Sequence, residues 1–230
     1  MSAVDTTPMM LSVREIRMIV ERILLHAGLP QGLIPDVRDA VLYSHAQGLG
    51  GLPMFKQVFA VTSTGAPAPM TADGSTLDAG GNHAWTVAPS AIDLALAAFR
   101  NGDGPLTVVR LREADELRLL AGFAARYGAA ADVTVANDGA ARIRIISEGI
   151  ARDTVFEAAL AAGLPVPRAL WHDLYVFSHR ALAKDSVESR RHAGPVMVDA
   201  EGRVHGRDDD DSDLAFLFPD GKPKNVQEQA

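Results

Sequence analysis

The stretch Ser12–Leu24, with the sequence SVREIRMIVERIL, decides how this chain begins to fold. Ser12 and Glu15 form a Ser-x-x-Glu capping box, in which each side chain can bond the backbone N–H of the other residue. Apolar residues then recur every three to four positions, as on one face of a helix: Val13, Ile16, Ile19, Val20, Ile23 and Leu24. The pattern predicts an amphipathic helix that buries one face and ends at Gly28.

A second helix is expected over Ile34–Ala46, so the chain opens with a helical hairpin. The glycine-rich turn Gly48–Pro53 follows, and then a short helix over Met54–Ala60. Such a turn can let a ligand approach the backbone. However, no strand precedes it, as in a dinucleotide-binding loop, and no Lys-Ser/Thr pair ends it, as in a phosphate loop. A purely structural turn is the simpler interpretation.

The middle of the chain alternates between strand and helix patterns. Residues 62–81 are rich in Thr, Ser, Gly, Pro and Ala, which predicts a loop. Asn137-Asp138-Gly139 predicts a hairpin turn, and Arg142 and Arg144 alternate with apolar residues on a strand with one wet face. The other expected elements are strands at Ala84–Val87, Leu106–Leu111, Asp132–Ala136, Ala141–Ile146 and Val196–Val198, and helices at Ala91–Arg100, Ala114–Tyr127, Thr154–Ala162 and Pro167–Ala183.

These elements predict an α+β fold with an N-terminal helical hairpin, a small mixed β-sheet, and a C-terminal helix followed by a polar loop. We expect one domain over residues 1–220, with an alternative division into a helical part, 1–61, and an α/β part, 82–220. Residues 221–230 are polar and are expected to form a disordered tail.

Composition narrows the class of protein. The chain has 230 residues, 47% hydrophobic and 22% charged, which is typical of a globular protein. The net charge of -7 argues against binding to nucleic acid, and no apolar run is long enough for a membrane span. Cysteine is absent, and the N-terminus lacks the basic start of a signal peptide, so we expect a cytoplasmic protein. The abundance of Ala and Arg over Lys is typical of a GC-rich bacterial genome.

The best candidate for chemistry is the polar loop Lys184–Pro195. Arg190 and Arg191 can clamp a carboxylate or phosphate, because the guanidinium fork matches two oxygens. His192 can act as a general acid or base near neutral pH. The other predicted ligand-binding residues are Ser186, Ser189 and Gly194.

The same loop also has a structural interpretation. Ser186 can cap the loop, Gly194 can make its turn, and the two arginines can pair with Asp185 and Glu188. The sequence assigns no cofactor.

No metal site is predicted. The acidic run Asp208–Asp213 has part of a calcium-loop spacing, but Leu214 stands where that loop needs glycine. A solvated acidic loop is the favoured interpretation, with a weak divalent-cation site as the alternative. The seven histidines include no His-Glu-x-x-His pair, and no Gly-x-Ser-x-Gly elbow supports a serine hydrolase.

Both ends of the chain resemble an uncharacterised bacterial family, a catalogued domain of unknown function. Ala27–Leu33 and Ala46–Leu52 resemble its opening, in which Gly-Leu-Pro and Gly-Leu-x-Gly turns flank the second helix. Ser186, Ser189-Arg190 and the later Gly and Asp residues resemble its Ser-x-x-Ser-Arg motif and its Gly/Asp-rich end. The resemblance implies an architecture and attention to the loop, but no activity.

A weaker resemblance links Gly48–Phe55 to the N-terminal part of the type-2 malate/lactate dehydrogenase family. Ala46-Gln47 stands where that family has Ser-His, and His45 lies two residues early, so the catalytic histidine is missing in this register. The rest of the chain is also short for that fold.

Two classes of function follow from the sequence. The first is a small-molecule enzyme of bacterial catabolism that binds an anionic ligand at residues 184–195. The second is a non-catalytic accessory or assembly subunit, with the helical hairpin as its interface. A homodimer is compatible with both classes.

Overall fold

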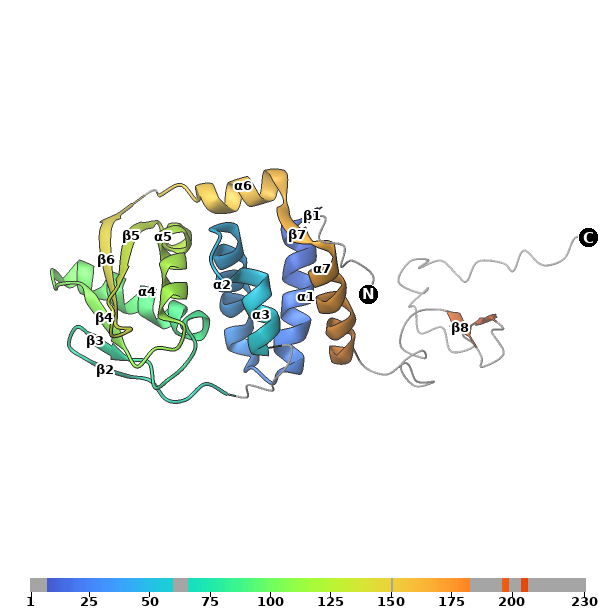
Figure 1. Cartoon of the computed structure of the whole chain (residues 1–230), viewed down its shortest axis with the longest axis horizontal. Coiled ribbons are helices and arrows are strands. Elements are labelled where there is room, and N and C mark those ends of the chain that lie inside the picture. The colour runs from blue at the N-terminus through green and yellow to red at the C-terminus, as the bar shows by residue number, and fades with distance from the viewer. Residues whose placement is uncertain (1–7, 60–65, 150, 183–195, 199–203, 207–230) are drawn as a thin grey trace, which may run out of the picture. The chain divides into compact units, whose positions relative to one another are not determined.

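The N-terminal helical hairpin forms as its sequence predicts. In the computed structural model, which describes residues 8–59, 66–149, 151–182, 196–198 and 204–206, α1 spans Val13–His26 and α2 spans Ile34–Ala46 (Figure 1). Both bonds of the capping box are present: the backbone N–H of Ser12 donates to Glu15 Oε2 (2.9 Å), and the backbone N–H of Glu15 donates to Ser12 Oγ (3.2 Å). All six apolar stripe residues of α1 are buried.

Contacts divide the chain into two compact units, residues 1–182 and 183–230. The described part of the second unit is the antiparallel strand pair β8 (Val196–Val198) and β9 (Val204–Gly206). None of the helices in the described part of the chain combines the length and the apolar character that a bilayer crossing requires. The expectation of one domain over residues 1–220 stays a prediction.

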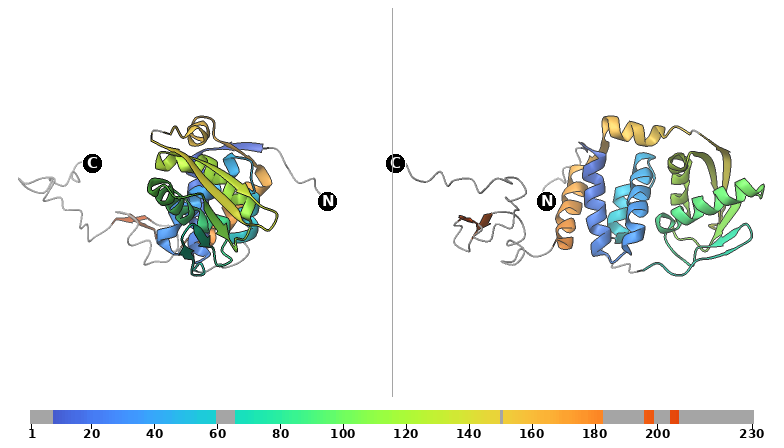
Figure 2. Two further views of the ribbon diagram at one scale, coloured as in Figure 1. Left: turned by 90° about the vertical axis from the view of Figure 1, so that its left-hand side faces the viewer. Right: turned by 180° about the vertical axis from the view of Figure 1, so that it is seen from behind.

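The helical layer of the first unit is built around α1. Helix α1 lies between α2 and α7 (Arg168–Ser178), as the view from behind shows (Figure 2). Helix α3 (Gly51–Phe59) packs against α2 and α7. Two short strands, β1 (Pro8–Leu11) and β7 (Leu164–Pro167), pair in antiparallel fashion beside these helices. The short 3-10 helices of the unit are η1 (Gln31–Leu33), η2 (Ala114–Leu119), η3 (Ala124–Tyr127) and η4 (His179–Ala181).

A five-stranded mixed sheet forms the second layer, in the order β2-β3-β4-β6-β5. The strands span Thr71–Asp73 (β2), Thr76–Asp78 (β3), Leu106–Val109 (β4), Ala129–Val135 (β5) and Ala141–Glu148 (β6). Strands β3 and β4 are parallel and are joined by the long helix α4 (Ala84–Asn101), whereas the other pairs are antiparallel. The unit β3-α4-β4 is therefore a βαβ crossover.

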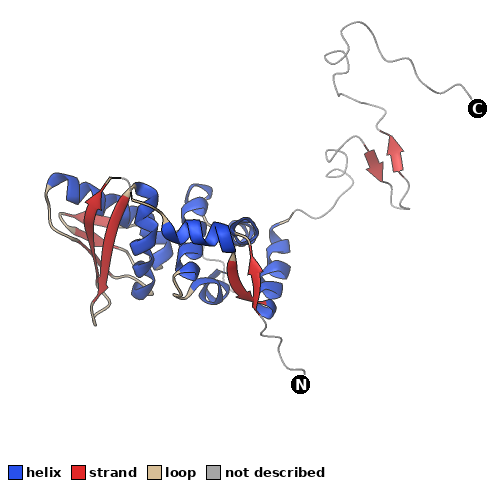
Figure 3. Cartoon of the chain, turned by 90° about the horizontal axis from the view of Figure 1, so that it is seen from above, coloured by secondary structure: helices blue, strands red, loops and turns tan. Residues whose placement is uncertain are grey.

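One face of this sheet is covered by helices. Helix α4 packs on β4 and β6, and α5 (Leu120–Phe123) packs on β5. The opposite face exposes Arg142 and Arg144, while Ile143 and Ile145 are buried, so the predicted wet face of this strand is confirmed. Helix α6 (Thr154–Ala162) runs from the sheet to the helical layer (Figure 3).

Several predicted boundaries are wrong. Residues 84–87 form no strand, because α4 begins at Ala84 and contains Pro89 in its interior. Part of the expected 62–81 loop forms the two strands β2 and β3. The expected helix Ala114–Tyr127 is broken into two 3-10 segments around the short helix α5. The α+β class, the opening hairpin and the small mixed sheet are as predicted.

Candidate functional site

The connection from β3 to α4 is a tight glycine turn. Gly80 and Gly81 adopt φ angles of +61° and +77°, which favour glycine. A Cβ atom on Gly80 would lie 2.5 Å from the carbonyl oxygen of Pro69. The backbone N–H of Gly80 donates to Asp78 Oδ1 (2.9 Å) at the end of β3. The turn therefore needs glycine at position 80, because the backbone at Pro69 passes directly over it.

The end of β4 runs alongside this turn. The N–H of Gly81 donates to the carbonyl of Arg110 (2.8 Å), and the N–H of Arg112 donates to the carbonyl of Asn82 (3.0 Å). The carboxyl ends of the parallel strands β3 and β4 thus lie together, which is where ligands bind in α/β units. Arg110 and Glu113, on either side of Arg112, have left-handed φ angles of +52° and +55°. Such backbone strain is found preferentially at functional sites.

Asn82 fixes a second chain segment at the same place. Its Oδ1 accepts from the N–H of Ala68 (2.9 Å), and its Nδ2 donates to the carbonyl of Ala68 (2.8 Å). Nδ2 also donates to the carbonyl of Ala79 (2.9 Å). Both ends of this buried amide are therefore used, and they hold the segment around Ala68 against the start of α4.

His83 is the N-cap of α4 and presents an unused donor. Its Nδ1 accepts from the backbone N–H of Trp85 (3.2 Å), so the ring proton of the neutral form is on Nε2. The side chain is only 2% exposed, and Nε2 has no hydrogen-bond partner within the described ranges. Burial, helped by the positive charge of Arg112, lowers the pKa of His83 to about 4. The imidazole is therefore neutral at pH 7, and its Nε2–H has no acceptor among the residues that the structure describes.

A cavity of about 220 Å³ opens beside this imidazole. His83 and Arg112 provide its charged or titratable walls, and Thr86 adds a hydroxyl whose proton goes to the carbonyl of His83 (2.7 Å). No aspartate or glutamate is among the described residues that line it. Arg112 makes no ion pair with any carboxylate in the described part of the chain. The positive end of the α4 dipole adds to the positive electrostatic potential that Arg112 creates in the cavity.

This arrangement can bind but is poorly equipped for proton transfer. An N–H, a guanidinium and a helix N-terminus suit a small anion. A histidine with a pKa near 4 is a weak general base at neutral pH. No group of three His, Asp or Glu side chains suited to a metal ion occurs among the residues that the structure describes.

The glycine-rich turn Gly48–Pro53 serves a different purpose. The buried carboxylate of Glu116 accepts from the N–H of Gly50 (2.6 Å), from Ser44 Oγ (2.5 Å) and from Trp85 Nε1 (2.8 Å). A Cβ atom on Gly50 would lie 2.6 Å from that carboxylate. Gly50 is needed because a buried carboxylate approaches its backbone, and Gly51, the first residue of α3, lies against the backbone of His45. These contacts support the structural interpretation of the turn.

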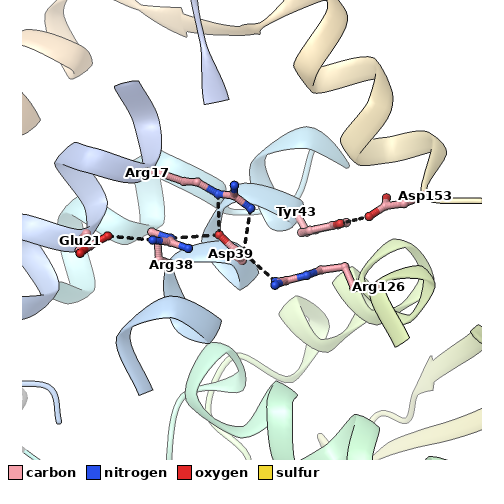
Figure 4. Close-up of polar contacts among 7 residues, drawn as sticks. All are labelled: Arg17, Glu21, Arg38, Asp39, Tyr43, Arg126 and Asp153. Atoms are coloured by element: carbon pink, nitrogen blue, oxygen red, sulfur yellow. Dashed lines mark hydrogen bonds and ion pairs between the residues drawn. The ribbon is translucent and has the colours of Figure 1, made fainter. Parts of the chain in front are cut away.

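A second buried carboxylate gathers three arginines (Figure 4). Asp39, 1% exposed, pairs with Arg17 (2.9 Å), Arg38 (3.1 Å) and Arg126 (2.7 Å). Beside it, Tyr43 donates a very short hydrogen bond to Asp153, and burial raises the pKa of Tyr43, so this phenol stays protonated. These side chains come from α1, α2 and η3 and from the start of α6, so the network joins the helical layer to the α/β layer.

The residues predicted to carry chemistry lie outside the described residues: Ser186, Ser189, Arg190, Arg191, His192 and Gly194. His45, from the dehydrogenase resemblance, bonds the carbonyl of Pro165 through Nε2 (3.1 Å) and does not line the cavity. Sequence reasoning missed His83 and Arg112. The signal was Gly80-Gly81-Asn82-His83 before an apolar helical stripe, but the absence of a recognised strand before it concealed the βαβ unit.

Comparison with known proteins adds little to this geometry. No protein-family model matches the chain, and no curated protein matches it. Among solved structures, malate dehydrogenase from Entamoeba histolytica is 14% identical, with a TM-score of 0.40, over 74% of this chain and 62% of that protein. Malate dehydrogenase from Pyrococcus horikoshii OT3 is 15% identical, with a TM-score of 0.42, over 73% of this chain and 63% of that protein.

The chain thus spans less than two thirds of either dehydrogenase. The two neighbours agree in name with the weaker family resemblance, at a likeness too low to transfer an activity. The assignment of a function to this site therefore depends on the chemistry of the site itself.

Proposed function

We propose that the protein binds a small anionic ligand, a carboxylate or a phosphate, in the cavity beside His83. The observation that carries the proposal is the buried Nε2–H of His83, which has no partner among the described residues and belongs to a side chain that lines the cavity. A buried donor without a partner costs about 1–3 kcal/mol. A ligand oxygen would supply the missing acceptor.

The charge of the ligand follows from the walls of the cavity. Arg112 brings a guanidinium that no described carboxylate neutralises, and the N-terminus of α4 adds a partial positive charge. The size of the ligand follows from the volume, about 220 Å³, below the roughly 300–1,000 Å³ typical of drug-sized sites. The ligand is therefore a molecule of a few heavy atoms, or the anionic group of a larger one.

Isothermal titration with acetate, oxalate and inorganic phosphate tests this proposal. We expect at least one of them to bind the wild-type protein, and Arg112→Ala to weaken that binding about tenfold or more. A hydrogen bond to a charged group contributes about 1.5–3 kcal/mol, and 1.4 kcal/mol corresponds to tenfold. Arg118→Ala is the matched control, because Arg118 is another exposed arginine of the same segment and pairs with Asp115.

Two results would refute the proposal. One is a folded wild-type protein that binds none of the three anions at tens of millimolar. The other is an affinity that Arg112→Ala leaves equal to that of the Arg118→Ala control.

The loop at residues 184–195 stays a second proposed contact for an anion, through Arg190, Arg191, Ser186, Ser189 and Gly194. His192 is its proposed general acid or base. The same titration with Arg190→Ala distinguishes the two sites, because only a substitution in the site that binds the anion weakens binding. If Arg190→Ala weakens binding and Arg112→Ala does not, the loop replaces the cavity as the binding site.

A further inference from the structure

Helix α1 carries a second apolar stripe on its outer side. A surface helix normally has one apolar stripe, which faces the core. The inner stripe of α1 is buried, yet Met18 and Leu25 on the outer side are 42% and 43% exposed. Leu160 of α6, which faces the same space, is 60% exposed. Together they form the walls of a groove of about 430 Å³.

The groove also carries two arginines that have no ion-pair partner in the part of the chain that the structure describes. Arg17 is held by Asp39, and Glu21 is held by Arg38 (2.8 Å). Arg14 and Arg22, however, line the groove and have no ion pair with any of the described carboxylates. They lie eight residues apart on one helix, a separation of about 12 Å along its axis. The surface thus alternates positive charge and apolar contact: Arg14, Met18, Arg22 and Leu25.

We propose that this groove docks an acidic amphipathic helix of a partner protein. Helix-in-groove recognition uses apolar anchors at i, i+3 or i+4, and i+7 on the bound helix. The stripe from Arg14 to Leu25 covers eleven residue steps, about 16 Å, which matches three turns of such a helix. Carboxylates two turns apart on the partner would face Arg14 and Arg22.

A second copy of this chain fits the groove less well. If two α1 stripes packed against each other, four arginines would meet at the interface. The nearby carboxylates of Glu15 and Glu21 are already bonded to Ser12 and Arg38. Like charges brought together without compensation disfavour such a contact.

Two synthetic helices test the proposal. Both are stapled 14-residue peptides with leucines at i, i+4 and i+7; one has glutamates at two positions eight residues apart, and the other has lysines there. Fluorescence anisotropy with the full chain should show about tenfold tighter binding of the glutamate peptide, since two exposed ion pairs contribute up to about 1 kcal/mol each. The double variant Arg14→Glu/Arg22→Glu should reverse this preference, and Met18→Glu should abolish binding of the glutamate peptide.

Arg118→Glu is the control for a charge change at an arginine that does not line the groove. Equal binding of the two peptides, or no binding of either, would overturn the proposal. The proposal would also be overturned if light scattering gave the mass of a dimer for the wild-type chain and of a monomer for Met18→Glu. The occupant of the groove would then be a second copy of the chain. A peptide of residues 208–218 that competes for the groove more strongly than the glutamate peptide would also overturn the proposal. The occupant would then be the chain's own acidic run and not a partner protein. None of these outcomes depends on anion binding beside His83.

Discussion

At the scale of single residues, His83 combines a structural role with the binding role that we propose for it. Its Nδ1 caps α4, while its Nε2–H remains unpaired within the described ranges. The capping role requires the neutral ring, because Nδ1 must accept, and the cost of protonating a buried imidazole beside Arg112 keeps the ring neutral. The stability of α4 therefore depends on pH through this one histidine.

That coupling predicts a defined dependence of stability on pH. The unfolded chain binds a proton at His83 below a pKa of about 6.5, whereas the folded chain does so only below about 4. The unfolded state therefore holds more protons between these values, so the folded state loses stability as the pH falls through this window. Between pH 7 and pH 5 the loss due to His83 should be about 2 kcal/mol.

Urea unfolding of wild type and His83→Asn at both pH values measures this contribution. Asparagine keeps a good N-cap and removes the titration, so the variant should lose about 2 kcal/mol less than wild type over this range. Equal losses would mean that His83 is not the buried neutral group described here. His45, whose pKa burial also lowers, is present in both proteins and cancels in the comparison.

At the scale of elements, Glu116 explains why the turn after α2, the segment η2 and the start of α4 adopt one arrangement. Its carboxylate accepts from Ser44, Gly50 and Trp85, three donors from otherwise separate segments. Ser44 Oγ in turn accepts from the N–H of Gly51 (2.8 Å). The glycine-rich turn and the helix that carries His83 are thus held by the same acceptor.

Glu116→Gln should therefore destabilise the protein by about 1–3 kcal/mol, because the amide NH₂ would face donors where an acceptor is needed. Urea unfolding measures the change. Glu113→Gln is the control, because Glu113 is exposed and lies three residues away. A loss below about 0.5 kcal/mol would show that the three donors have other acceptors.

The helices with strong periodicity could be predicted from sequence, and the start of α4 could not. The apolar stripe and the capping box of α1 depend only on residues close together in the sequence. The segment SVREIRMIVERIL is therefore enough to predict this helix. In α4, Pro89 suggested a helix that begins after it. The helix begins at Ala84, five residues before Pro89, because His83 caps it and because Trp85 finds its partner in Glu116, 31 positions away. The cavity depends on this long-range pairing, so its residues could not be grouped from spacing alone.

At the scale of the whole first unit, Asp39 joins the two layers. It lies on α2 and receives arginines from α1, from α2 itself and from η3 (Figure 4). Arg17 also stacks over the ring of Phe156 on α6, with its guanidinium carbon 4.8 Å from the ring centroid. Nothing in the local sequence around Asp39 indicates Arg126, because the contact exists only after the layers have packed.

Asp39→Asn should cost more stability than the loss of any one arginine. Removing the shared carboxylate leaves Arg17 and Arg126 without a counter-charge among the described residues, while Arg38 keeps its pair with Glu21. We expect a cost on the order of 2–3 kcal/mol, because the arginines still reach solvent. Arg126→Ala removes one of three partners and should cost about 1 kcal/mol. Thermal and urea unfolding of the two variants give the comparison. A larger loss for Arg126→Ala would place the stabilisation in its contact with Phe123 instead, where the guanidinium carbon lies 5.1 Å from the ring centroid.

We propose the buried Nε2–H of His83 as the group that binds a small anion. The most direct test is a ¹H–¹⁵N NMR titration of the histidine side chains of the full chain with the anion that binds, at pH 7. We expect the Nε2–H signal of His83, assigned by its loss in His83→Asn, to shift as the anion saturates the protein, and we expect Arg112→Ala to suppress the shift. Saturation of the protein with no change in this signal would contradict the claim, because the anion would then occupy another site.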